Sequence, residues 1–83
     1  MKLTQTQDLI LSTVLESAGM VYPSATEYKA LAGAAKKALK ANLSGLSERQ
    51  IKAIQAIAAG DVFRDGRNVR AFRNGMSALL VAA

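Results

Sequence analysis

The stretch from Asp61 to Met76 carries four arginines at every third position: Arg64, Arg67, Arg70 and Arg73. A guanidinium group forms paired hydrogen bonds with phosphate, carboxylate and guanine edges, whereas the lysine ammonium acts only as a point charge. Asp65 is the one acid among these arginines, and none follows it in the chain. The series therefore predicts binding to an anion or an acidic partner, with Arg67 and Arg70 as the best single candidates. Internal pairing with carboxylates is the structural alternative.

A second basic set lies on one flank of the helix expected after Ser24: Lys29, Lys36, Lys37 and Lys40. In one interpretation, these lysines contact nucleic-acid phosphates or insert into a groove of DNA. In the other, they form a solvated face that keeps an alanine-rich helix in solution. The residue types and their spacing favour neither interpretation.

Histidine and cysteine are both absent from the chain. The commonest general base, the thiolate nucleophile and the usual zinc ligands are therefore missing. Most of the six acids lie near expected helix starts. Their interaction with the helix dipole explains them there without a catalytic role. No glycine-rich phosphate loop is present, because the stretch from Gly60 to Gly66 lacks both the required spacing and the lysine. We therefore expect no enzymatic activity, no bound metal and no cofactor.

The chain is strongly basic, with a formal net charge of +5 and a pI of about 10.0. This balance favours an anionic partner such as nucleic acid or an acidic protein surface. The lack of cysteine fits a reducing compartment. No signal peptide follows Met1, and the longest apolar run, Ala78 to Ala83, is far too short to span a membrane. The expected location is the cytoplasm.

Three segments begin with the capping-box pattern, a hydroxyl residue followed three positions later by Glu or Gln: Thr4-x-x-Gln7, Ser24-x-x-Glu27 and Ser47-x-x-Gln50. In this pattern the two side chains satisfy backbone N–H groups at a helix start. The apolar periodicity that follows predicts helices from about Gln5 to Ala18, from Ser24 to about Leu43, and from Glu48 to Ala59, with Gly19, Gly45 and Gly60 as stops. The prediction is one mainly α domain over residues 1–83, a compact bundle of four to five short helices.

Gly33 leaves the second helix open to two interpretations. A break there would give two helices, Ala25–Leu31 and Ala34–Leu43, joined by a tight turn. That arrangement is a helix-turn-helix with the lysine-rich helix second. A glycine inside a helix costs only about 1 kcal/mol relative to alanine, so one continuous helix with a basic side also fits.

Residues 61–83 are compatible with a loop followed by a fourth helix. In this interpretation Asp61–Arg67 is the loop and Asn68 caps the helix. One apolar stripe then faces the core: Val69, Phe72, Met76, Leu79, Leu80 and Ala83. The narrowness of this stripe favours the helix.

The same residues also contain a hairpin signal. Asp65-Gly66 is among the strongest short-range hairpin dipeptides. Residues 62–64 and 69–72 would then pair as short strands, forming a small β-hairpin wing at 62–72. A helix would begin only near Asn74.

Several short runs are similar to parts of one family: Lys2-Leu3-Thr4 with Ile10-Leu11-Ser12, Gly33-Ala34-Ala35-Lys36-Lys37, Asp65-Gly66-Arg67, and Arg73-x-Gly75-Met76-x-Ala78-Leu79. They resemble small bacterial winged-helix DNA-binding domains. The resemblance implies that the lysine segment is the recognition helix and that Asp61–Phe72 is the wing. It also implies a role in transcription regulation in bacteria or phage.

Taken together, these features predict a small basic DNA-binding regulatory protein of the helix-turn-helix type, which docks on phosphates through lysines and arginines. The alternative is a non-enzymatic protein–protein interaction module, such as an inhibitor or an assembly adaptor. That module would present the arginine loop to an acidic protein partner and would depend on apolar anchors such as Phe63 or Phe72. A homodimer that buries a surplus apolar face is a third interpretation.

Overall fold

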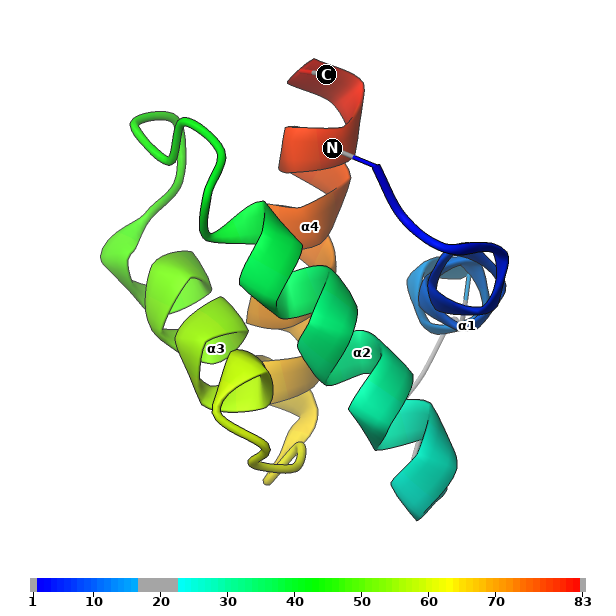
Figure 1. The fold of residues 1–83 in the computed structure, drawn as a ribbon. Coiled ribbons are helices and arrows are strands. Elements are labelled where there is room, and N and C mark those ends of the chain that lie inside the picture. The colour runs from blue at the N-terminus through cyan, green and yellow to red at the C-terminus, as the bar shows by residue number, and fades with distance from the viewer. Residues whose placement is uncertain (1, 17–22, 83) are drawn as a thin grey trace.

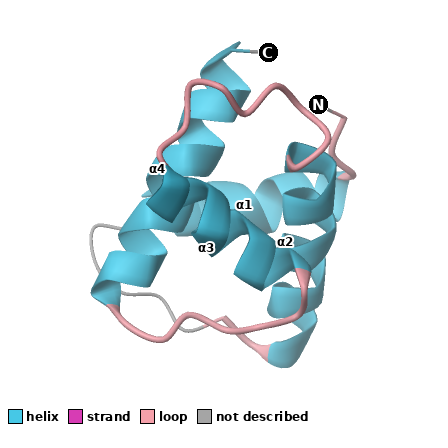
Figure 2. Cartoon of the chain, turned by 90° about the vertical axis from the view of Figure 1, so that its left-hand side faces the viewer, coloured by secondary structure: helices cyan, strands magenta, loops and turns pink. Residues whose placement is uncertain are grey.

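A computed structural model describes residues 2–16 and 23–82, which fold into a bundle of helices (Figure 1). The helices are α1 (Gln5–Glu16), α2 (Ala25–Ala38), α3 (Glu48–Ala58) and α4 (Gly66–Ala82). No strand occurs in the described residues, so the prediction of a mainly α fold is confirmed for them. α2 packs against both α1 and α3, and α3 packs along α4. Figure 2 shows α3 in front, with α4 on one side of it and α2 on the other.

The first three helices begin at the predicted capping boxes. At the start of α3, the Gln50 backbone N–H donates to Ser47 Oγ at 3.2 Å, and the Ser47 N–H donates to Gln50 Oε1 at 3.0 Å. The same reciprocal pair of hydrogen bonds opens α1 and α2. Each box satisfies two backbone N–H groups that would otherwise lack a partner at the helix start. The three predicted helix starts are therefore confirmed.

The capping box of α2 differs from the other two because its last residue is a carboxylate. The Ser24 backbone N–H donates to Glu27 Oε1 at 2.8 Å, and this hydrogen bond holds the pKa of Glu27 below its ordinary value. A smaller contribution in the same direction comes from the Ser24 side chain. Since the pKa is lowered in the folded state, Glu27 stabilises the fold above its ordinary pKa of about 4.3. That contribution is lost as the pH falls through the lower, folded-state value.

This difference predicts a change in acid sensitivity for Glu27→Gln. Glutamine keeps the acceptor oxygen, as it does in the boxes of α1 and α3, but it does not titrate. We expect the urea midpoint of the variant to fall less than that of the wild type between about pH 6 and pH 3. An equal fall in the two proteins would show that Glu27 is not a source of the pH dependence.

α2 is continuous through Gly33 and ends at Ala38, short of the predicted end at Leu43. The helix-turn-helix that a break at Gly33 would produce is therefore not formed in residues 25–43. A Cβ at position 33 would collide with the side chain of Gln7 in α1. Lys37 Nζ donates to Gln7 Oε1 at 2.8 Å across the same contact. The glycine thus leaves room for the Gln7 side chain against α2 and does not interrupt the helix.

The predicted end of α3 lies at a glycine in a left-handed conformation. α3 ends at Ala58, and Gly60 has a φ of +92°, so the predicted stop is confirmed. This left-handed conformation favours glycine because it has no Cβ. α1 is described up to Glu16. Its predicted end at Ala18 and its predicted stop at Gly19 lie outside the described residues.

The C-terminal segment is a helix and not a hairpin. α4 begins at Gly66, before the predicted cap Asn68. Asp65 Oδ1 accepts the Asn68 backbone N–H at 2.9 Å, so Asp65 has the capping role. The small β-hairpin wing at residues 62–72, the alternative to this helix, is not seen in the structure, and the favoured interpretation of a fourth helix is the one that forms. The helix is favoured because it places every residue of the apolar stripe on one side, whereas two strands of three or four residues would bury little of it.

The core is formed by one face of each helix together with Phe63 of the loop before α4. The contribution of α4 is the predicted stripe, in which Val69, Phe72, Met76 and Leu79 are buried and Leu80 is half-buried. The ring of Phe72 is fully buried, with its centroid 5.4 Å from that of Phe63. A Cβ at Gly75 would lie 3.1 Å from Ile54 Cδ1, so this glycine lets α4 lie close to α3. Ala83 lies outside the described residues.

Candidate functional site

Arg64, the first of the four predicted arginines, is partly engaged within the protein. It lies in the loop before α4, and its Nη2 forms an ion pair with Asp61 Oδ2 at 3.0 Å. Asp61 also accepts the Val62 backbone N–H at 2.9 Å. The Val62 bond and then the bond from Arg64 hold the pKa of Asp61 below its ordinary value. The side chain of Arg64 is 74% exposed, so this pair lies at the surface.

Arg73 points away from the other predicted arginines. Its Nη2 donates to the carbonyl oxygen of Leu15 at 3.0 Å, near the end of α1 as described. The geometry of the helix explains why Arg73 points in another direction than Arg67. Residues three positions apart in a helix are rotated by about 300°, so Arg73 lies about 120° around α4 from Arg67. The structure thus gives Arg73 a tertiary contact.

Arg67 and Arg70 line a groove between α3 and the first half of α4, together with Arg49 of α3. The groove consists of two adjoining hollows of about 670 and 520 Å³. Both hollows are lined by Ser47, Arg49, Arg67 and Ala71. All three arginines are exposed. The surface formed by Arg49, Arg67 and Arg70 is called the arginine groove below.

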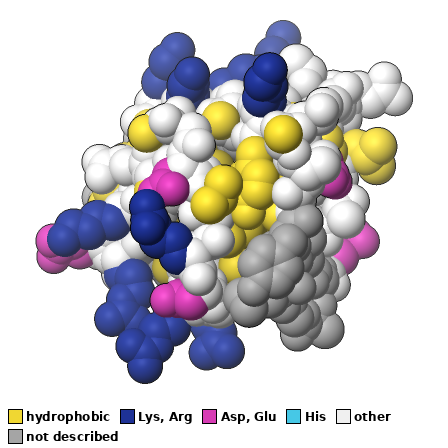
Figure 3. Space-filling view, turned by 90° about the horizontal axis from the view of Figure 1, so that it is seen from below, with side chains coloured by type: hydrophobic (Ala, Val, Ile, Leu, Met, Phe, Trp, Pro, Cys, Tyr) yellow, Lys and Arg dark blue, Asp and Glu magenta, His cyan; other side chains and the backbone are white. Residues whose placement is uncertain are grey.

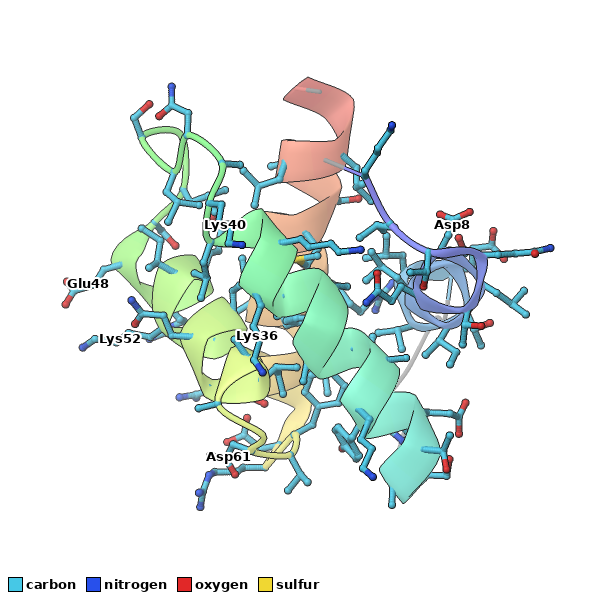
Figure 4. The ribbon with its side chains drawn as sticks, viewed as in Figure 1. Asp8, Lys36, Lys40, Glu48, Lys52 and Asp61 are labelled. Carbon is cyan, nitrogen blue, oxygen red and sulfur yellow. The ribbon has the colours of Figure 1, made fainter. Side chains whose placement is uncertain are left out.

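Two acids lie beside the arginine groove, Glu48 in the lining of one hollow and Asp65 next to Arg67 and Arg70, but neither forms an ion pair with its arginines. All six acidic residues belong to the part of the chain that the structure describes. The ion pairs found there are Glu48 with Lys52 at 3.2 Å and Asp61 with Arg64. Glu48 and Lys52 project from the same side of α3 (Figure 4). No carboxylate in residues 2–16 or 23–82 forms an ion pair with an arginine of the groove.

Two helix starts border the arginine groove. Ser47 caps α3, and Asp65 accepts a hydrogen bond in the first turn of α4, so Arg49 and Arg67 each lie in a first helical turn. Backbone N–H groups in a first turn favour negative charge nearby. Asn68 and Asn74 add uncharged hydrogen-bonding side chains to the lining. The groove therefore suits a ligand that carries phosphate or carboxylate groups.

The predicted lysine set divides between the surface and an internal contact. Lys29 and Lys36 are exposed on α2, and Lys40 is exposed just beyond its C-terminal end. Lys36 and Lys40 project from the same side of the molecule (Figure 4). Lys37 is half-buried and bonded to Gln7, so it is not part of this surface. The surface formed by Lys29, Lys36 and Lys40 is called the lysine row below, and no ion pair in the described residues involves it.

Arg49 is the groove residue that the sequence patterns did not indicate. It follows the Ser47 cap by two positions and belongs to no basic run. Its proximity to Arg67 depends on how α3 packs against α4, which residue spacing within either helix does not reveal. Gly75 is the one sequence signal for this packing, because a glycine inside a helical pattern often marks a close approach of another element. Here that element is α3.

The described residues hold no group of three His, Cys, Asp or Glu side chains that could bind a metal ion. None of the helices in the described part of the chain has both the length and the apolar character needed to cross a membrane. The resemblance to winged-helix domains stays a prediction, since comparison with protein-family models, curated proteins and solved structures finds no match.

Proposed function

We propose that this protein is a non-enzymatic module that binds double-stranded DNA through the arginine groove. Guanidinium groups form paired, charge-assisted hydrogen bonds with phosphate oxygens, and such contacts dominate the affinity of proteins for DNA. The observation that carries the proposal is the convergence of Arg49, Arg67 and Arg70 on one groove without a paired carboxylate in the described residues.

The residues around the arginines support contact with the sugar–phosphate backbone. Ser47, Asn68 and Asn74 supply uncharged hydrogen-bonding groups, which commonly position a protein on phosphates. The lining contains no aromatic side chain. Proteins that bind single strands generally stack bases on aromatic rings. The composition of the groove therefore favours a duplex over a single strand.

An acidic protein partner has weaker support. Such an interface usually depends on a few exposed apolar or aromatic anchors. Phe63 and Phe72, the anchors suggested by the sequence, are 4% and 0% exposed and belong to the core. Among the described residues, the large exposed apolar side chains are Leu9 of α1 and Val62 of the loop before α4, and neither lines the arginine groove.

The proposal is tested by titrating the wild-type protein against a random-sequence DNA duplex over a range of salt concentrations. Three neutralised phosphates correspond to a slope of about −2.7 in a plot of log affinity against log salt. The affinity should then fall at least about 40-fold between 50 and 200 mM salt. A polyglutamate peptide serves as the acidic-protein control. No binding to the duplex at low salt, or tighter binding to the peptide than to the duplex, would contradict the proposal.

A further inference from the structure

The lysine row is a basic surface that the arginine groove does not include. Lys29 and Lys36 are seven positions apart, and Lys40 follows four positions later. With a rise of 1.5 Å per residue, Lys36 lies about 10 Å along α2 from Lys29, and Lys40 follows just beyond the end of the helix. A DNA duplex carries one negative charge for about every 1.7 Å of its axis, so a row of this length can lie along several phosphates.

The lysine row and the arginine groove face different directions. On α2, the buried residues Leu31, Ala34 and Ala38 lie on the opposite side of the helix from Lys29 and Lys36. Arg67 and Arg70 likewise lie opposite the buried stripe of α4. In Figure 2, α2 and α4 flank α3, and the two helices also contact each other.

The surface between the two basic regions is not uniformly positive. In Figure 3, basic side chains gather along the upper edge and in a separate group at the lower left. Hydrophobic and acidic side chains lie between these groups, together with further basic side chains towards the left. Because the lysine row and the arginine groove face different directions, a single straight duplex that contacts one is directed away from the other.

The thickness of the molecule suits simultaneous binding of two duplexes. Its principal extents are 30 × 27 × 23 Å. Electrostatic repulsion is screened over about 8 Å at physiological ionic strength. The smallest of these extents is more than twice that distance, so screening would weaken the mutual repulsion of two duplexes held on different faces.

We propose that the lysine row is a second DNA-binding surface and that the protein bridges two duplexes, one held by each surface. This inference rests on the proposed function of the arginine groove. The lysine row then binds DNA in addition to keeping the protein in solution. The protein as a whole would hold two DNA segments together.

The test is a bridging assay in which a duplex fixed to beads captures a second, fluorescent duplex through the protein. Mobility shifts with one duplex are measured in parallel. The wild type should shift the single duplex and capture the second one. The Lys29→Ala/Lys36→Ala/Lys40→Ala variant should still shift the single duplex, while its capture of the second duplex falls to the level of beads without protein. The matching variant with alanine at Arg49, Arg67 and Arg70 should be impaired in both assays.

The outcomes separate the two proposals. A wild type that shifts one duplex but captures no second duplex overturns bridging and leaves the proposed function standing. Undiminished capture by the lysine variant also overturns it, because bridging would then come from two arginine grooves in a homodimer. No mobility shift by the wild type would contradict both the proposed function and the bridging inference.

Discussion

Replacing Arg49, Arg67 and Arg70 with alanine should weaken binding to random duplex DNA by about two orders of magnitude at 0.1 M salt. Three lost phosphate contacts make the slope of log affinity against log salt shallower by about 2.7. At 1 M salt the electrostatic contribution is small, so the wild type and the variant should bind almost equally. The difference in slope then makes the affinity of the variant more than a hundredfold lower at 0.1 M salt. Fluorescence anisotropy with a labelled duplex measures both quantities. The three side chains are exposed, so the urea midpoint should change little.

The lysine row provides a charge-matched comparison for this experiment. Alanine at Lys29, Lys36 and Lys40 lowers the formal net charge from +5 to +2, as the arginine variant does. The lysine variant should lose affinity for a single duplex about tenfold at most, because the arginine groove is intact. Equal losses in the two variants would mean that net charge, and not the groove, determines the affinity.

Phe72→Ala should remove most of the folding free energy. Its side chain is fully buried and packs against Phe63. Truncating a buried phenylalanine typically costs about 3–5 kcal/mol, because it removes apolar contacts and leaves a cavity. A domain of this size is stabilised by on the order of 5 kcal/mol. Urea unfolding followed by circular dichroism should therefore show a variant that is largely unfolded, or that unfolds at very low urea.

Leu9→Ala is the control for Phe72→Ala. Leu9 is also a large apolar residue within a helix, but it is 68% exposed. Its replacement should change the free energy of unfolding by about 0.5 kcal/mol or less. If the two variants were destabilised to the same extent, the assignment of Phe72 to the core would be wrong.

The helix starts could be predicted from the sequence because the capping signal is local. A capping box needs only four consecutive residues, and its hydrogen bonds form within them. The end of α2 lacked such a signal. The predicted stop was Gly45, but the helix ends at Ala38, and Leu39 is its C-cap. No glycine or proline marks that position, so the end depends on the path of the chain to α3.

Residues 61–73 show how two valid patterns compete. Asp65-Gly66 suits a hairpin, and the spacing of Val69, Phe72 and Met76 suits a helix. The helix forms because it buries these three side chains in the core, whereas the Asp65-Gly66 dipeptide only permits a turn. Asp65 still has a local structural role, because its side chain accepts the N–H of Asn68 in the first turn of α4.

The candidate site was predicted only in part, for a reason of geometry. Arg67 and Arg70 line the arginine groove, as their prominence in the sequence suggested. Arg73 belongs to the same run, but the helical rotation carries it towards α1. Arg49 completes the groove from another helix. A pattern along one segment can identify residue types, but the packing of α3 against α4 decides which of them meet.

The most direct test of the arginine groove is a titration of isotope-labelled protein with a short random duplex, followed by backbone amide chemical shifts. The groove predicts that the first amides to shift and saturate belong to residues 47–50 and 66–74. Residues of the lysine row should respond later, as the second surface fills. Unchanged amides at 47–50 and 66–74, with shifts confined to α1 or α2, would contradict DNA binding at the arginine groove.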